Sequence, residues 1–161
     1  MDHLITAFPN NITNALLTVS TLKFKQPSSP IHTILICGMG GSGIGGKIVS
    51  QWMEKECKAP ILLINDYSIP EYVNQNTLVI GCSYSGNTEE TLEAIEIARK
   101  KDAHIICVCS GGTMQTWCNA NNFDCVIVPG GNPPRSALAF SLVHLLNTVS
   151  YTHLRAHETL R

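Results

Sequence analysis

The stretch Leu78-Val-Ile-Gly-Cys-Ser-Tyr-Ser-Gly-Asn-Thr88 joins an apolar run to a turn rich in hydroxyl side chains. The residues that follow, Thr88–Lys101, predict a helix: acidic side chains stand in its first turn, basic ones in its last, and apolar residues recur at helical spacing between them. The side chain of Asn87 or Thr88 is expected to cap this helix. A buried strand that leads through a turn into a capped helix is the repeating unit of an α/β fold.

Further apolar runs, rich in Ile, Val and Leu, lie on both sides of this stretch. Together they predict strands near 32–37, 61–65, 77–82, 104–109 and 125–128. The runs do not alternate polar and apolar residues, which is typical of strands buried on both faces of a parallel sheet. Further helices are predicted over Gly43–Lys55, Met114–Asn121 and Ser136–Val149, and a short one from Asn14 to Phe24 precedes the first strand. Strands that alternate with helices predict a layered α/β fold.

The first predicted strand leads into a second unusual turn, Gly38-Met-Gly-Gly-Ser-Gly43. Glycines let the backbone turn sharply and approach a ligand closely, and N–H groups at a helix N-terminus favour an anion. Gly38, Gly40 and Gly43 fit the dinucleotide-binding pattern G-x-G-x-x-G, with Asp66 about 20 residues farther on.

Two other interpretations of the same turn remain. Gly41–Lys47 fits most of a P-loop, but Ile48 stands where a hydroxyl would hold magnesium, which argues against a nucleotidase. A pocket for a sugar phosphate fits equally well, and this turn alone does not choose between it and a dinucleotide site.

The turn after Cys82 carries three hydroxyl side chains. Ser83, Ser85 and Thr88 lie within six residues, at the start of the predicted helix. Hydroxyls together with free backbone N–H groups can hold a phosphate monoester without a metal or a lysine, although Ser and Thr also serve as ordinary helix caps. In a flavodoxin-like strand order the first and third strands are neighbours, so both turns would face one crevice.

Composition excludes several classes of protein. The 161 residues suffice for one domain, and 11 Lys+Arg against 12 Asp+Glu give a net charge of −1 without a basic cluster, so no nucleic-acid partner is expected. No apolar run approaches the ~20 residues that span a bilayer, so no membrane partner is expected either. The seven cysteines show no C-x-x-C pair or zinc-ligand spacing. We therefore expect reduced thiols, a cytoplasmic location and no bound metal.

Three motifs together resemble a known family. Gly38-Met-Gly-Gly-Ser-Gly43, Ser83-Tyr-Ser-Gly-Asn-Thr88 and Gly131-Asn-Pro-Pro-Arg-Ser136 are similar to the N-terminal sugar isomerase (SIS) domain of bifunctional phosphoglucose/phosphomannose isomerases, from about Ile31 to Val149. The resemblance implies a three-layer α/β sandwich with a five-stranded parallel sheet in flavodoxin-like order, two such domains per full-length chain, and a homodimer. It also implies interconversion of glucose 6-phosphate or mannose 6-phosphate with fructose 6-phosphate, through an enediolate and without cofactors.

The resemblance assigns roles to particular side chains. The site residues it implies are a phosphate clamp of Ser83, Ser85 and Thr88, sugar contacts from Gly41 and Ser42, and Arg135 beside the reacting carbons. A fixed guanidinium suits that last role, because an enediolate develops negative charge on oxygen. The turn Pro133-Pro134 before Arg135 would hold its direction. The family's general base and ring-opening groups lie in the second domain, so this chain is expected to carry only the binding half.

These expectations divide the chain into three parts: 1–30, an N-terminal helical segment; 31–149, the SIS domain; and 150–161, a tail. The tail resembles a translated sequencing-adapter remnant and is expected to be non-native, so that His153 and His157 have no metal role; a genuine helical extension is the other interpretation. The apolar helix Ala137–Leu146 is expected to expose a patch without the second domain. A regulatory SIS module that binds sugar phosphates without catalysis is the alternative function.

Overall fold

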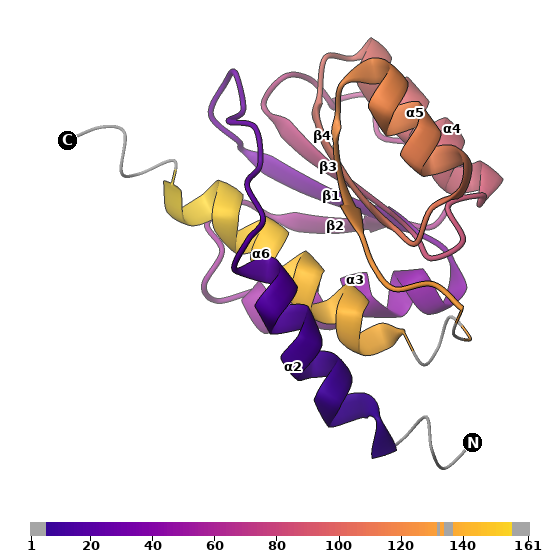
Figure 1. Cartoon of the computed structure of the whole chain (residues 1–161). Coiled ribbons are helices and arrows are strands. Elements are labelled where there is room, and N and C mark those ends of the chain that lie inside the picture. Colours follow the sequence, from indigo (N-terminus) through magenta and orange to yellow (C-terminus); the bar gives the residue numbers. More distant parts are fainter. Residues whose placement is uncertain (1–5, 132, 134–136, 156–161) are drawn as a thin grey trace.

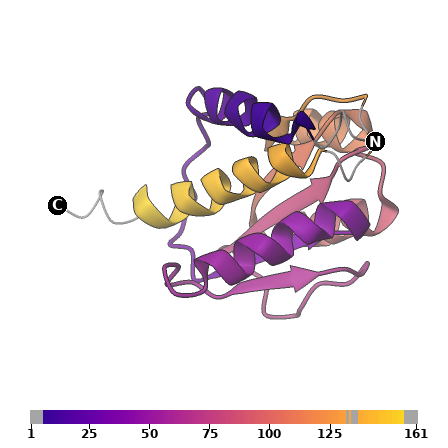
Figure 2. The ribbon, with the colours of Figure 1, turned by 90° about the horizontal axis from the view of Figure 1, so that it is seen from below.

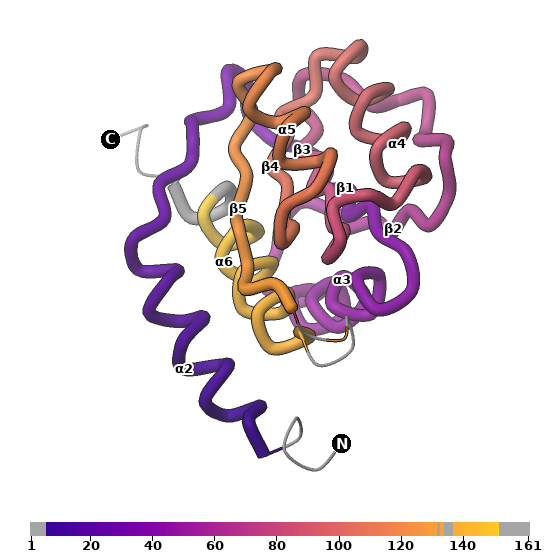
Figure 3. Tube along the Cα trace, turned by 45° about the vertical axis from the view of Figure 1, so that its right-hand side comes forward, coloured from indigo at the N-terminus to yellow at the C-terminus, as the bar shows by residue number. Residues whose placement is uncertain are grey.

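The computed structural model describes residues 6–131, 133 and 137–155 and contains one five-stranded sheet. All strand pairs are parallel, in the order β2-β1-β3-β4-β5, and Figure 3 shows β5 and β2 at opposite edges. The strands are β1 (Thr33–Gly38), β2 (Ile61–Ile64), β3 (Thr77–Ser83), β4 (His104–Cys109) and β5 (Asp124–Ile127). Every bound lies within one residue of its predicted position, and the flavodoxin-like order is confirmed.

Helices cover both faces of the sheet and complete a three-layer α/β sandwich (Figure 1). On one face lie α3 (Gly40–Met53) and α6 (Leu138–Arg155), with α2 (Phe8–Val19) packed on the outside of α6, as Figure 2 shows. On the other face lie α4 (Glu89–Lys100) and α5 (Gly112–Asn121). Both layers bury nearly all residues of the central strands β1, β3 and β4, which is why these runs in the sequence are apolar throughout, whereas the edge strands β2 and β5 are partly exposed.

Helix α3 begins at Gly40, three residues before its predicted start, because its glycines lie inside the helix. A Cβ on Gly46 would come within 2.8 Å of Ile36 Cγ2, so a glycine there lets α3 pack closely on β1. Lys47 consequently lies in the interior of α3 and on its exposed side, away from the turn after β1. A P-loop lysine stands beside the phosphate-binding turn, so this geometry removes the P-loop interpretation.

The bounds of α2 differ from the prediction of a helix from Asn14 to Phe24. The helix has a proline in its first turn, a position that proline favours, and it ends at Val19. The hydroxyls of Ser20 and Thr21 donate to the carbonyls of Leu17 and Thr18 at 2.7 and 2.8 Å, which closes the last turn and ends the helix.

The expected exposed patch on α6 is wrong, because the chain itself covers this helix. Ala137, Ala139, Phe140, Val143 and Leu145 are all buried, since α2 packs on one side of α6 and α3 and the sheet on the others. Exposed large apolar side chains instead include Leu17 on α2 and Trp52 on α3.

Helix α6 also continues past the predicted boundary at Val149. Tyr151 packs edge-on against Phe24 and donates to the Phe24 carbonyl at 2.8 Å. The division of the chain at residue 150 stays a prediction.

Two general findings concern the described part of the chain. All seven cysteines lie within it, and they are free thiols. None of the helices described is both long and apolar enough to cross a lipid bilayer.

Candidate functional site

The two turns singled out in the sequence lie side by side at the carboxyl edge of the sheet. β1 and β3 are direct neighbours, with Gly38 opposite Cys82 in the register, so the turns that follow them leave the sheet together. The backbone N–H of Tyr84 donates to Ser42 Oγ at 3.1 Å and joins the two turns. The predicted common edge is therefore confirmed, and Gly41 and Ser42, in the first turn of α3, lie beside the turn 83–88.

The hydroxyl of Ser83 holds the second turn in shape. It is 2.8 Å from Thr88 Oγ1 and accepts from the N–H groups of Gly86 and Thr88 at 3.1 and 3.4 Å. Because a hydroxyl oxygen has two lone pairs, these two N–H groups leave Ser83 to donate its proton to Thr88 Oγ1. The partly exposed Thr88 hydroxyl is then free to donate outward. Ser83 itself is 1% exposed, and its hydroxyl bonds within the turn, beside Thr88.

Ser85 is the exposed hydroxyl of the turn. Its oxygen accepts from the Asn87 N–H at 3.2 Å, which leaves its proton to donate to a ligand. Thr88 occupies the N-cap position of α4 as predicted, but its side chain makes no capping bond because it is engaged with Ser83. The N–H groups of the first turn of α4 have no intrahelical acceptors, so they add donors for an anion.

The turn after β4 braces this site, a feature that the sequence interpretation missed. The Met114 N–H donates to the Gly86 carbonyl at 2.8 Å, and Thr113 donates to Asn87 Oδ1 from both its N–H and its hydroxyl at 2.9 Å. A Cβ on Gly86, where φ is +71°, would lie 1.8 Å from the Gly111 carbonyl oxygen. The signal in the sequence was Ser110-Gly-Gly-Thr113, directly after the fourth apolar run.

The dinucleotide interpretation lacks its structural context. Dinucleotide-binding sheets have the strand order 3-2-1-4-5-6, whereas β3 here lies on the side of β1 away from β2. Asp66 follows β2 and accepts the N–H of its neighbour Tyr67 at 2.7 Å. With its amide nitrogen turned toward the glycine turn, Asn65 donates to the Gly38 carbonyl at 2.6 Å. The end of β2 thus supports the turn after β1.

Carboxylates gather on the β2 side of the site. The negative charge of Glu90 is the main cause that raises the pKa of Tyr67 above its usual value. Burial and the charges of Glu89, Glu93 and Asp66 raise it further. The acidic first turn of α4 therefore faces the segment after β2. Within the described ranges, no group of three or more His, Cys, Asp or Glu side chains is arranged to hold a metal ion. Arg135 lies outside the residues that the structure describes.

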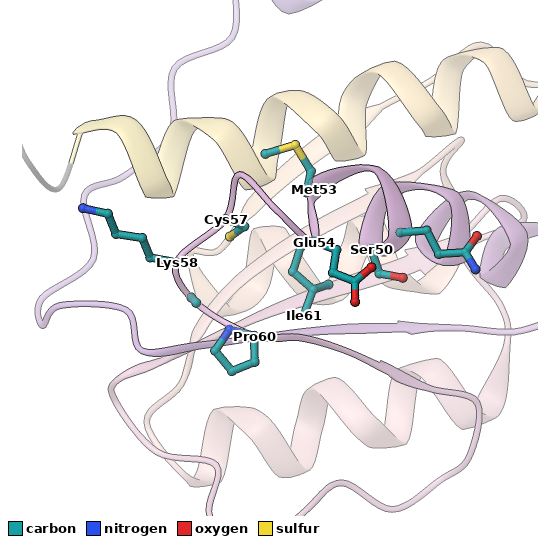
Figure 4. Close-up of a pocket in the computed structure, with 9 residues that line it drawn as sticks. Ser50, Met53, Glu54, Cys57, Lys58, Pro60 and Ile61 are labelled. Carbon is teal, nitrogen blue, oxygen red and sulfur yellow. The ribbon is translucent and has the colours of Figure 1, made fainter.

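Two pockets are lined by residues outside the turns 38–43 and 83–88, although the first adjoins the turn after β1 through Asn65. One of about 400 Å³ is lined by the residues after β2, including Asn65 and Asp66. Another, of about 570 Å³, opens at the amino edge of the sheet, between the end of α3 and the start of β2, with Ser50 and Glu54 in its wall (Figure 4). It contains none of the predicted site residues. The turns at the carboxyl edge remain the better candidate, because ligands of open α/β sheets bind at that edge where the strand order reverses.

A flavodoxin-like sheet with glycine-rich and hydroxyl-rich turns at its switch point defines a class of small-molecule-binding α/β domains. A family model described as the SIS domain matches residues 29–143, and the chain belongs to this family.

The chain is similar to curated proteins named bifunctional phosphoglucose/phosphomannose isomerase. It is 38% identical over 138 residues to that of Caldicellulosiruptor bescii, covering 86% of this chain and 41% of the relative. It is 44% identical over 115 residues to that of Thermoplasma volcanium, covering 71% of this chain and 36% of the relative. The chain thus spans well under half the length of these relatives.

Solved structures share the fold. The C-terminal domain of glucosamine-fructose-6-phosphate aminotransferase from Francisella tularensis has a TM-score of 0.74 at 20% identity, over 94% of this chain and 47% of that one. The Vibrio vulnificus NanR protein complexed with ManNAc-6P has a TM-score of 0.59 at 15% identity, over 94% of this chain and 56% of that one.

Proposed function

We propose that this chain binds a sugar 6-phosphate and is the substrate-binding half of an aldose–ketose isomerase. The enzyme would interconvert glucose 6-phosphate or mannose 6-phosphate with fructose 6-phosphate. The names of the relatives support the reaction class. The observation that carries the proposal is the turn from Ser83 to Thr88, whose outward hydroxyls stand at the N-terminus of α4. This turn is hydrogen-bonded to the turn after β1 through the Tyr84 N–H and Ser42 Oγ.

The phosphate is assigned to Ser85, Thr88 and the first N–H groups of α4. These groups combine hydrogen bonds with the positive end of the helix dipole, and they need neither a metal nor a lysine. Gly41 and Ser42, on the neighbouring turn, are assigned to the sugar. With the phosphate held at one end, the reacting carbons would be fixed relative to the protein, which is the main entropic contribution of binding to catalysis.

Isomerisation moves a proton between C1 and C2 and places negative charge on oxygen in the enediolate. We assign the stabilisation of this charge to Arg135, whose guanidinium would act as a preorganised partner. Glu89 and Glu90 are explained by the helix dipole in the first turn of α4. The proposal therefore assigns the general base and the ring-opening acid to a part of the enzyme beyond these 161 residues, and the parent enzyme to a homodimer.

Calorimetry with fructose 6-phosphate tests the binding site. Ser85→Ala should weaken binding by about 1–3 kcal/mol, the range for a hydrogen bond to a charged group. Ser50→Ala is the matched control, because Ser50 lies in the amino-edge pocket, and its hydroxyl donates to the Lys47 carbonyl at 3.0 Å. A loss of affinity in Ser50→Ala with none in Ser85→Ala would show that the sugar phosphate binds at the amino edge of the sheet. Tighter binding of NAD than of any sugar phosphate would refute the proposal.

A coupled assay tests the division of labour. The 161-residue chain should bind fructose 6-phosphate without converting it, since general acid and base groups are typically worth about 10²–10⁴-fold each. Rapid conversion would place the base within these residues. In a longer chain that contains the second domain, Arg135→Lys should lower kcat more than it raises KM. If that longer chain bound the sugar phosphate but had no activity, the regulatory SIS module would be favoured.

A further inference from the structure

Tyr84 makes hydrogen bonds to three other segments at the carboxyl edge of the sheet. Its N–H donates to Ser42 Oγ at 3.1 Å, in the turn after β1. Its carbonyl accepts from Ser110, after β4, at 2.9 Å from the N–H and 2.6 Å from the hydroxyl. Its phenol hydroxyl donates to the Pro129 carbonyl, after β5, at 3.0 Å. One residue therefore connects the turns that follow β1, β3, β4 and β5.

The bond from the phenol to Pro129 is the part of this network that requires a tyrosine. The other bonds use the backbone of residue 84, so any side chain would preserve them. The ring is half-buried against the core beneath α3 and α6, which directs the hydroxyl across the sheet edge. A phenol in a fixed ring position can hold a carbonyl that lies well beyond the reach of a shorter hydroxyl side chain.

Pro129 is a point where the chain needs such support. β5 is a short edge strand, and beyond it the Val128 N–H donates to the Cys109 carbonyl at 2.9 Å. Two exposed glycines follow Pro129, and Gly131 has a φ of +83°. Glycine leaves the backbone many conformations, so the bond to the Pro129 carbonyl sets the direction of this segment just before the two glycines.

We infer that Tyr84 is a positioning residue, which holds the segment after β5 at a fixed distance from the phosphate turn and the turn after β1. This inference rests on the function proposed above. The phosphate contacts all lie within one turn and do not depend on the phenol. The sugar must fit between turns from different strands, so its binding depends on their separation. Tyr84 thus governs binding of the sugar part of the substrate and leaves binding of the phosphate part unaffected.

Tyr84→Phe separates the two halves of the site. It keeps the ring and removes the bond to Pro129. Calorimetry on the 161-residue chain should show fructose 6-phosphate binding about 3- to 10-fold more weakly, the equivalent of one neutral hydrogen bond, and inorganic phosphate binding as to the wild type.

Tyr151→Phe is the matched control, because its hydroxyl also donates to a backbone carbonyl, that of Phe24, at the other edge of the sheet. The Tyr151 hydroxyl also accepts from Gln26 Nε2 at 2.8 Å, so Tyr151→Phe should lower stability to urea at least as much as Tyr84→Phe, and it should leave both affinities unchanged. Equal weakening of both ligands by Tyr84→Phe, or no weakening of either, overturns the inference while the proposed function stands. A wild-type chain that binds neither ligand refutes the proposed function, and the inference with it.

Discussion

Several residues at the carboxyl edge of the sheet make contacts that hold the turns of the candidate site in shape without a ligand. Ser83 is buried and orients the Thr88 hydroxyl, and the side-chain oxygen of Asn87 accepts a hydrogen bond from Thr113. Gly86 has a φ of +71° and faces the Gly111 carbonyl with no room for a Cβ. Residue identity in this turn is therefore set by contacts between turns, and a substitution should be judged by what it meets there.

Gly86→Ala should destabilise the protein more than Gly40→Ala does. Both positions have a positive φ, which costs an alanine about 1–2 kcal/mol. A Cβ at Gly40 meets nothing within 4 Å, whereas at Gly86 it would lie 1.8 Å from a backbone oxygen. The clash should add about 1–3 kcal/mol, the usual cost of overpacking. Urea denaturation of the two variants measures the difference, and equal losses would mean that the turn after β4 moves aside freely.

Helix α6 shows how an element acquires its stability from its surroundings. It is enclosed by α2, α3 and the sheet, and His144 lies on it with 0% of its surface exposed. Neither ring nitrogen of His144 has a hydrogen-bond partner within the described part of the chain. Burial accordingly lowers the pKa of His144 below its ordinary 6.5, because the charged imidazole would lose its hydration.

The depressed pKa of His144 makes stability depend on pH in a defined direction. Below pH 6.5 the unfolded chain binds a proton at His144 that the folded chain does not bind, so stability is fully present above 6.5 and falls as the pH falls. The loss from this group is at most about 1.4 kcal/mol per pH unit. Denaturation at pH 7.5 and 5.5 should show a smaller change for His144→Leu than for the wild type. If His144→Leu changes with pH as much as the wild type does, His144 is not the group responsible.

At the scale of the whole molecule, the three layers isolate most of the thiols from solvent. Cys37 and Cys82 lie in the central strands and are at most 3% exposed. Burial raises the pKa of Cys37 to about 12. Burial is also the main cause that raises the pKa of Cys82, and the neighbouring thiols of Cys37 and Cys109 raise it further. Cys57, between α3 and β2, is only half-buried, and burial raises its pKa too.

Alkylation should therefore follow the layers. A short pulse of iodoacetamide at pH 8 should modify Cys57 well before Cys37 or Cys82, because the thiolate is the nucleophile and needs contact with solvent. Peptide mass spectrometry measures the order, and a pulse in denaturant should remove the difference. Labelling of Cys37 as fast as Cys57 in the native protein would show that the central sheet opens readily.

Local patterns in the sequence predicted much of this protein. The central strands β1, β3 and β4 were predictable because both of their faces are covered, so that apolar runs record burial directly; the shorter edge strands β2 and β5 are mostly apolar although partly exposed. The turns after β1 and β3 were predictable because glycines and hydroxyls gather directly after two apolar runs, where a strand passes into a helix. Together with the resemblance of three motifs, these patterns indicated the family before any coordinates.

Only the tertiary structure decided which atoms of those turns remain free for a ligand. The roles of Tyr84, Asn87 and Ser110 depend on residues between 26 and 45 positions away, brought to one edge by the strand order. The covering of α6 by α2 likewise joins the two ends of the described chain. A single sequence records burial and local backbone preference residue by residue, whereas a hydrogen bond between distant turns leaves no periodic pattern. The fold could therefore be predicted from the sequence, whereas the hydrogen bonds between the turns of the site depend on how the strands pack.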